Sequence, residues 1–564
     1  MDVCQSLYTL DGALLPYLRV RDALALSATN TMFARLRETT LRTRVQIRIP
    51  PNVSFHETCA RVGCLSGLVT HVRFECSESE CVNADSANEL ALVHFATSLK
   101  TLAASGLASP QTRVLRVLHL LEVLDVGGAP DDGLEPFNLE DGPSPSLSQI
   151  TTFRAKNRRL ESAHILANWS RLRELQLSLH HADDALVLLS LITSRLSGLE
   201  HLSLNGRAFA DLTLQTPWAC AQSLTYLSIE NSNVFDASFI QQLQHLRVLR
   251  IKQAPLIHLH PLATLKYLRV LDLMETSVSD VTLLGDSNFH ALQQLNIALT
   301  FVSDLNFLIG EGVGSKLQSL DVSFSSVADM EASVWARARL ANLTHLSMDG
   351  TDVEDFGPIL MNCPLLRFFS CKQSKAKRLL SNTDDIPAFK LETVICSETN
   401  VTSLDAFRHT VSLKSVIASQ CSSLTSIRGL LLSRTSLTTL HLSDSKIIKD
   451  ASEILTQMRS LQFLHVCVQY VAGGLEFLQD LQQLQELRLS MNFIPLTETE
   501  CNHFFGPIML LLNLQYFYVH GCSGKVFRNE GLQEDGGIVG PVVKKWLVDR
   551  GVEYLDWKLL DLSL

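Results

Sequence analysis

Four cysteines and two histidines lie close together near the N-terminus, in a spacing that could hold a metal ion. They form two cysteine pairs, each separated by four residues, with a histidine near each pair: His56, Cys59, Cys64, His71, Cys76 and Cys81. Zinc takes four sulfur or nitrogen ligands, but its usual cysteine pairs are separated by two residues. Cysteine also serves as a small buried apolar residue. We therefore predict core cysteines here, with no metal and no cofactor.

A glycine-rich stretch, GEGVGSK at residues 310–316, superficially matches a phosphate-binding loop. Such a loop follows a strand and opens a helix, whereas this stretch leads into an expected strand at Leu317. No Ser/His/Asp or Cys/His arrangement stands out elsewhere in the sequence. We predict that the chain is not an enzyme and has no catalytic residues.

The amino-acid composition limits which classes of partner the chain is expected to bind. The chain has 564 residues, 46% of them hydrophobic and 19% charged, with a net charge of −10. Mild acidity argues against nucleic-acid binding, which depends on Lys and Arg, and the most apolar run, residues 504–514, is too short to span a membrane. Thirteen scattered cysteines and no visible signal peptide favour the cytoplasm, with the nucleus as the alternative.

The elements that must position any binding residues follow an internal repeat of 22 to 30 residues. Leucine-type residues recur at offsets 0, 3 and 5 of each unit. The clearest units start at Leu224, Leu246, Leu268, Leu292, Leu317, Leu343, Leu366, Leu391, Leu413, Leu437, Leu461 and Leu484. Fainter units start at Val69, Leu99, Leu121, Ile150, Leu172, Leu199 and Leu514, and a closing strand is expected near Val552.

This pattern resembles the leucine-rich repeat family. Offsets 3 and 5 of a strand point into the core, while offsets 2, 4 and 6 point out. One unit cannot bury its own leucines, so neighbouring units stack and share one core. The resemblance implies an α/β fold, a horseshoe-shaped solenoid with a parallel concave sheet that docks another protein. We expect a small N-terminal helical module in addition to the repeats.

Two polar positions are expected to support each unit. Offset 8, where the family has Asn, carries mostly Thr or Ser, which can meet the same hydrogen-bonding requirement. Offset 12 is often Asp and stands just before a short apolar turn, so we predict that these residues are helix N-caps. They are Asp211, Asp236, Asp280, Asp304, Asp329 and Asp355.

The outward positions become large and aromatic toward the C-terminus. Aromatic residues and Arg are enriched among interface hot spots. We therefore predict that a protein partner contacts the concave face here, at Phe463, His465, Arg488, Tyr516, Tyr518 and His520. The alternative is that these side chains pack under residues 521–545 and close the end of the solenoid.

Residues 13–36 depart from the repeat and are typical of two short helices, 13–18 and 22–36. The first helix ends in Tyr-Leu, and an Asp that starts the next helix follows after three residues. Leu-Ser and an aromatic residue seven positions after that Leu complete the pattern. The residues are Tyr17, Leu18, Asp22, Leu26, Ser27 and Phe33.

This spacing resembles the F-box, which docks the Skp-type adaptor of cullin–RING ubiquitin ligases. The usual Leu-Pro, Cys and Trp are replaced here by Ser6-Leu7, Asn30 and Phe33. The resemblance implies a non-catalytic substrate-recognition subunit of an SCF-type ubiquitin ligase. It also implies an adaptor-binding ridge, formed by Leu14, Leu15, Pro16, Leu18, Leu24 and Leu26.

The same helices could instead be a plain cap of the repeats. The chain would then be a scaffold or regulator of a cytoskeletal or signalling assembly, with no link to ubiquitin. In either case we expect three segments: the F-box-like module or cap at 1–48, the repeats at 49–540, and a closing helix and strand at 541–564.

Overall fold

The computed structural model divides the chain into two compact units, Met1–Leu268 and Arg269–Leu564. The boundary lies inside the span 49–540. The structure describes residues 45–49, 69–74, 98–104, 118–127, 148–155, 166, 168–178, 182–207, 217–309, 313–328, 338, 340–379, 390–443, 448, 450–467, 475–491, 498–521 and 541–556.

Short parallel strands form the sheet of the first unit, and each pairs with the next in sequence. The strands are β1 (Val45–Ile49), β2 (Val69–Phe74), β3 (Thr101–Ala104), β4 (Val123–Asp125), β5 (Thr152–Ala155), β6 (Glu174–Ser178), β7 (His201–Asn205), β8 (Tyr226–Glu230) and β9 (Val248–Lys252). Helix α6 (Ala182–Ser194) and the 3-10 helices Ser238–Gln242 and His260–Thr264 lie in the connections.

Strand β1 is not expected from the repeat pattern. It lies almost wholly in the segment 1–48, for which the sequence favours helices, and it pairs in parallel with β2. Its sequence, VQIRI, places apolar residues at every second position, which is a strand period. Parallel pairing of the repeat type therefore starts at Val45.

The second unit repeats the same plan. Its parallel strands are β10 (Val270–Asp272), β11 (Gln294–Asn296), β12 (Ser319–Asp321), β13 (His345–Ser347), β14 (Phe368–Ser370), β15 (Thr393–Ile395), β16 (Ser415–Ile417), β17 (Thr439–Leu442), β18 (Phe463–Cys467), β19 (Glu486–Met491), β20 (Tyr516–Gly521) and β21 (Glu553–Asp556).

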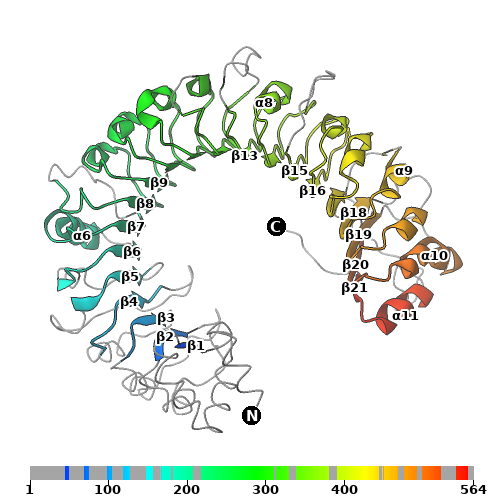
Figure 1. Cartoon of the computed structure of the whole chain (residues 1–564), viewed down its shortest axis with the longest axis horizontal. Coiled ribbons are helices and arrows are strands. Elements are labelled where there is room, and N and C mark those ends of the chain that lie inside the picture. Colours follow the sequence, from blue (N-terminus) through cyan, green and yellow to red (C-terminus); the bar gives the residue numbers. More distant parts are fainter. Residues whose placement is uncertain are drawn as a thin grey trace, which may run out of the picture. The chain divides into compact units, whose positions relative to one another are not determined.

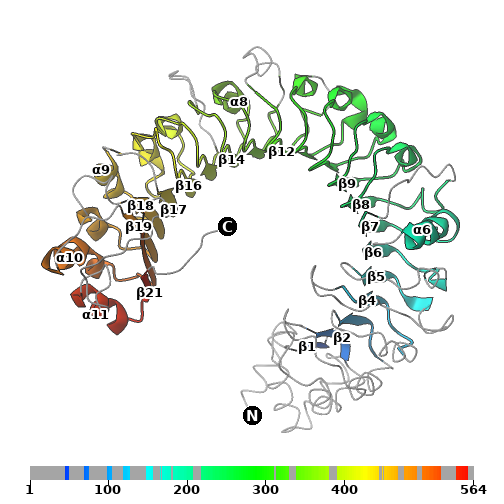
Figure 2. The ribbon, with the colours of Figure 1, turned by 180° about the vertical axis from the view of Figure 1, so that it is seen from behind.

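The helices of the second unit lie on one side of its strands and leave the other face uncovered (Figures 1 and 2). We call this uncovered side the open face. The α-helices are α8 (Gly357–Met361), α9 (Ala451–Leu455), α10 (Glu498–Phe505) and α11 (Pro541–Asp549). The 3-10 helices are Thr282–Gly285, Ser287–Phe289, Asn306–Ile309, Asp405–Phe407, Arg428–Ser433, Glu476–Asp480 and Gly506–Leu510.

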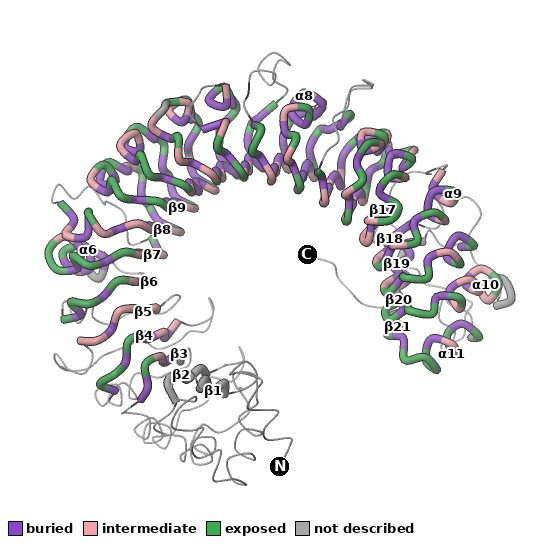
Figure 3. Tube along the Cα trace, in the orientation of Figure 1, coloured by how far each residue is buried: buried purple, intermediate pink, exposed green. Residues whose placement is uncertain are grey.

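The repeated leucines form the core, as the spacing predicts. In the unit that starts at Leu343, the residues at offsets 0, 3 and 5 are Leu343, Leu346 and Met348, and their exposed fractions are 0%, 1% and 0%. Figure 3 shows the buried residues concentrated between the strands and the connecting turns. Parallel strands, a shared leucine core and few helices confirm the predicted fold class, a leucine-rich repeat solenoid.

A residue in the left-handed conformation ends the strand region of successive repeats. It falls at offset 7 in every clear unit from Leu224 to Leu413, with φ between +50° and +61°. In the second unit its N–H still donates to the next repeat; Leu299 N, for example, lies 2.8 Å from the carbonyl oxygen of Ser323. The chain therefore turns out of the sheet without losing its ladder hydrogen bond.

The hydroxyl at offset 8 then closes this turn. Its oxygen donates to the carbonyl three residues earlier, at 2.8 Å for Thr276, 2.7 Å for Thr300 and 2.8 Å for Thr351. These side chains are at most 4% exposed. The hydroxyl thus satisfies a buried carbonyl where the family has Asn.

The aspartates at offset 12 lie one residue before the N-caps of the helices, and not at the N-cap position that the sequence predicts. The carboxylate of Asp280 accepts the N–H of Thr282 at 2.9 Å, but the N-cap of that 3-10 helix is Val281. Asp236 and Asp355 bond in the same way to the second residue ahead. They form Asx turns that lead the chain into the helix. Asp211 and Asp329 lie outside the described residues.

Helix α11 and strand β21 lie in the segment 541–564, where the sequence predicts a helix and a closing strand, and β21 pairs with β20. None of the helices in the described parts of the chain is long and apolar enough to cross a membrane.

Candidate binding site on the open face

Strands β17 to β20 present alternate side chains on the open face of the second unit. In β18, Leu464 and Val466 are buried, whereas Phe463 and His465 are partly exposed. The parallel register places His465 beside Arg488 of β19, and Arg488 beside Tyr518 of β20. Neighbouring repeats therefore bring their outward residues into rows.

Two rings from neighbouring strands flank one guanidinium, and a third ring stacks on one of them. The Cζ of Arg488 lies 5.4 Å from the ring centre of Phe463 and 5.0 Å from that of Tyr518, both within cation–π range. The ring of His441, on β17, stacks on Phe463 with a centroid distance of 4.4 Å and contacts His465 edge-on at 5.7 Å. We call the set His441, Phe463, His465, Arg488, Tyr516 and Tyr518 the aromatic cluster.

Glu486 holds Arg488 in this position. Both Nε and Nη2 of Arg488 lie 2.7 Å from Oε1 of Glu486, two residues earlier on the same strand. The two side chains are 40% and 22% exposed, so solvent weakens the pair, and its contribution to stability is at most about 1 kcal/mol. Its main effect is to orient and neutralise the guanidinium between the two rings.

The cluster carries little net charge at neutral pH. Burial, with a smaller contribution from the nearby Arg488, lowers the pKa of His441 to about 4. Burial and the carboxylate of Glu486 raise the pKa of Tyr518. Nε2 of His465 lies 2.9 Å from Oγ of Ser490. The surface is therefore aromatic and electrically balanced, and it suits contact with uncharged protein surface.

The structure brings together most of the residues that the sequence singles out on this face. Phe463, His465, Arg488, Tyr516 and Tyr518 all project from adjacent strands, and Tyr516 is exposed, at 38%. The backbone of His520 lies on β20, but its side chain is not among those described. The alternative packing under residues 521–545 falls mostly in 522–540, outside the described part of the chain.

His441 belongs to the cluster although the sequence-based set omits it. It occupies offset 4 of the unit that starts at Leu437, an outward position by the same rule. That position was the available signal, because the rule places His441 next to His465 across the sheet.

The adaptor-binding residues expected from the F-box resemblance all lie outside the described residues: Leu14, Leu15, Pro16, Leu18, Leu24 and Leu26. The same is true of the four cysteines at 59–81.

The cysteines whose side chains the structure describes are buried, and they form no disulfide with one another. They are Cys220, Cys363, Cys371, Cys396, Cys421 and Cys467. Burial raises the pKa of Cys220 and that of Cys363 to about 12, so these thiols behave as small core groups. Among the described residues, no group of three or more His, Cys, Asp or Glu side chains is placed to hold a metal ion.

The first unit carries a second row of outward polar groups that sequence reasoning missed. Nε and Nη2 of Arg154 lie 2.8 and 3.1 Å from the two carboxylate oxygens of Glu174. Burial opposes ionisation of Glu174, but Arg154 outweighs it and lowers the pKa of the carboxyl. On β7 and β8, His201 stacks on Tyr226 with centroids 3.7 Å apart. These groups are paired with each other, which favours a structural role.

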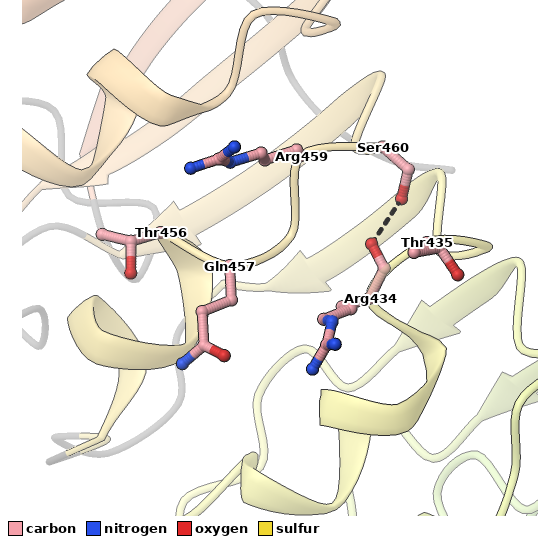
Figure 4. A pocket seen from close by; sticks show the side chains of 6 residues that line it. All are labelled: Arg434, Thr435, Thr456, Gln457, Arg459 and Ser460. Carbon is pink, nitrogen blue, oxygen red and sulfur yellow. Dashed lines mark hydrogen bonds between the residues drawn. The ribbon is translucent and has the colours of Figure 1, made fainter.

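Two open pockets lie where the connecting loops enter the strands. One, of about 510 Å³, is in the second unit (Figure 4), and its residues are Arg434, Thr435, Thr456, Gln457, Arg459 and Ser460. Oγ of Ser460 donates to the carbonyl of Arg434 at 2.9 Å. The other, of about 560 Å³, is in the first unit and includes the Arg173–Glu200 ion pair. Neither pocket includes a residue of the aromatic cluster.

Comparison with known proteins agrees with the repeat architecture. Residues 142–354 match a family model described as a leucine-rich repeat region. No curated protein matches the sequence.

Among solved structures, the chain is similar to the internalin InlF of Listeria monocytogenes, with 22% identity over 53% of this chain and 76% of that one and a TM-score of 0.38. It is also similar to TLR13 in its complex with ssRNA13, with 13% identity over 86% and 80% of the two chains and a TM-score of 0.45. A third similar structure is a leucine-rich repeat protein of Leptospira interrogans, with 14% identity over 85% of this chain and 97% of that one and a TM-score of 0.36.

The family model covers residues 142–354, and the repeat and the parallel strands of the described residues have the fold of a leucine-rich repeat solenoid. Proteins of this fold are generally interaction scaffolds rather than enzymes, because stacked repeats present an extended, preformed surface.

Proposed function

We propose that this chain is a non-catalytic protein-interaction subunit that holds a partner protein on the aromatic cluster. The observation that carries the proposal is the guanidinium of Arg488, which lies between the rings of Phe463 and Tyr518. Aromatic residues and Arg bury much area with few rotors to freeze, so they dominate interface energetics. The internal contacts of the cluster hold it ready for binding before a partner arrives.

The finer part of the proposal is that the partner is a substrate for ubiquitin transfer in the cytoplasm. Its support is the sequence resemblance of residues 14–36 to the F-box. The N-terminal module would dock a Skp-type adaptor of a cullin–RING ligase, and the repeats would hold the substrate. Such a subunit acts by raising the effective concentration of the substrate near the transferring enzyme.

The test of the cluster is affinity capture of the full chain from cells, with quantification of the proteins that copurify. Phe463→Ala and Arg488→Ala should each weaken retention of the same partner at least tenfold, as expected for hot-spot residues. Tyr267→Ala and Arg367→Ala are matched controls, because both residues are exposed and neither belongs to the cluster. Retention of every partner by both cluster variants would refute the proposal.

The test of the ubiquitin link uses the same capture. Leu15→Asp combined with Leu18→Asp should abolish retention of the adaptor and leave the partner of the cluster bound. If the intact chain retains no adaptor, or if residues 45–564 alone retain it, the F-box assignment is wrong. A scaffold of a cytoskeletal or signalling assembly is then the better assignment.

A further inference from the structure

Three large apolar side chains stand exposed together where two consecutive repeats leave the sheet of the second unit. The exposed fractions are 46% for Leu299, 66% for Phe301 and 48% for Phe324. We call these three residues the edge patch. They lie at the edge of the sheet, beyond the ends of β11 and β12, and not on the open face.

The residues of the edge patch come from two adjacent repeats. Leu299 and Phe324 occupy offset 7 of adjacent repeats, and the N–H of Leu299 donates to the carbonyl of Ser323, directly before Phe324. Phe301 follows Leu299 by two residues. The ring of Phe324 lies over the backbone of Gly350 in the next repeat, so close that a Cβ there would be 2.3 Å from Cδ1 of Phe324. Gly350 thus leaves room for this ring.

Large apolar residues at these positions carry a steric cost. Leu299 and Phe324 have φ of +56° and +53°, a conformation that large L-residues adopt only at a steric cost. Five other repeats of this unit make the same turn, and their residues are polar or lack a side chain: Glu275, Gly350, Gln373, Glu398 and Gln420. The unit therefore carries both steric strain and exposed apolar surface here, and both features are typical of binding sites.

The surrounding charge indicates what kind of partner fits. Among the described residues of 270–350, seven are Asp or Glu and one is Lys. Glu275 occupies offset 7 of the repeat before Leu299, in the same left-handed turn. Complementary charge guides association and selects partners. We propose that the edge patch binds a basic amphipathic segment of a partner protein, in which apolar side chains lie beside Lys or Arg.

The proposal is tested with the full chain and two designed, fluorescein-labelled peptides of 14 residues. One contains only Leu and Lys in amphipathic helical order, and the other has Glu in place of every Lys. Fluorescence anisotropy at physiological salt measures both affinities. We expect the Leu/Lys peptide to bind at least tenfold more tightly than the Leu/Glu peptide.

Variants separate the edge patch from general attraction to an acidic protein. Leu299→Asn combined with Phe324→Asn should weaken binding of the Leu/Lys peptide at least tenfold. Asn is chosen because Asn231 adopts the same conformation in this chain, at φ +51°. Gln373→Asn combined with Gln420→Asn is the matched control at the same offset, and it should leave the affinity unchanged.

A stability measurement distinguishes binding from structure. Because Asn relieves the backbone strain and exposes no apolar group, the Leu299→Asn, Phe324→Asn variant should melt at the same temperature as the wild type or higher. A lower melting temperature would mean that these side chains support the fold.

Three further results would overturn the assignment. They are equal affinity for the two peptides, undiminished binding of the Leu/Lys peptide by the double variant, and a concentration-dependent dimer of the wild-type chain that the double variant abolishes. The last result would mean that the edge patch binds a second copy of this chain.

Discussion

The buried hydroxyl at the strand exit provides a sharp test of how each repeat is held together. Oγ1 of Thr351 donates to the carbonyl of Met348 at 2.8 Å, and Thr351 is 1% exposed. Thr351→Val keeps the shape and removes only the donor. The carbonyl of Met348 then loses this hydrogen bond in a site closed to water.

The expected loss follows from the energetics of buried hydrogen bonds. A typical hydrogen bond contributes about 1 kcal/mol net, and a buried group left without a partner costs about 1 to 3 kcal/mol. We therefore expect Thr351→Val to destabilise the repeat by about 1 to 2 kcal/mol. An opening equilibrium of the repeat would shift by a factor of about 5 to 30.

Hydrogen exchange is the suitable assay, because a long repeat array need not unfold in one step. Amides of residues 343–351 should exchange faster by the factor given above, while distant repeats keep their protection. Thr425→Val is the control: its hydroxyl also donates to a carbonyl, that of Thr402 at 3.1 Å, but in an exposed position. Water replaces the lost donor there, so its effect should stay below about 0.5 kcal/mol.

Equal effects of Thr351→Val and Thr425→Val would refute the reasoning, because burial would then not matter. The same substitution at Thr276 and Thr399 should reproduce the loss, since both hydroxyls make the same bond. The losses of stability at Thr276 and Thr399 should add when both substitutions are combined, because these two repeats share no contacts.

Three other outcomes are expected. Gly350→Ala should lower the free energy of unfolding by about 1 to 2 kcal/mol, because the new Cβ forces the ring of Phe324 away. The loss should be smaller when Phe324→Ala is present as well. Equal losses of stability in urea titrations would contradict the contact between Phe324 and Gly350. Phe369→Ala should cost about 3 to 5 kcal/mol, since the ring is 0% exposed, and an unchanged urea midpoint would argue against a packed core. The lowered pKa of His441 means that the unfolded chain binds the proton more tightly, so stability should fall as the pH drops from about 6.5 to about 4, by about 1 kcal/mol after allowance for solvent screening. His441→Phe should remove that part of the pH dependence.

Much of the architecture follows from the sequence alone. The spacing of Leu343, Leu346 and Met348 places all three in the core, because a strand points alternate residues to the same side and stacked repeats must share their leucines. The outward position of Phe463 and Arg488 follows from the same alternation. These are local relations within a few residues, and local geometry determines them.

The relations between repeats required the tertiary structure. The stacking of His441 on Phe463 and the contact of Phe324 with Gly350 depend on how one repeat is placed on the next. The left-handed turn at offset 7 has no fixed residue type, since Leu, Phe, Glu, Gln, Asn and Gly all adopt it. Hydrogen bonds to the neighbouring repeat impose that conformation, so the residue type at offset 7 does not predict the turn.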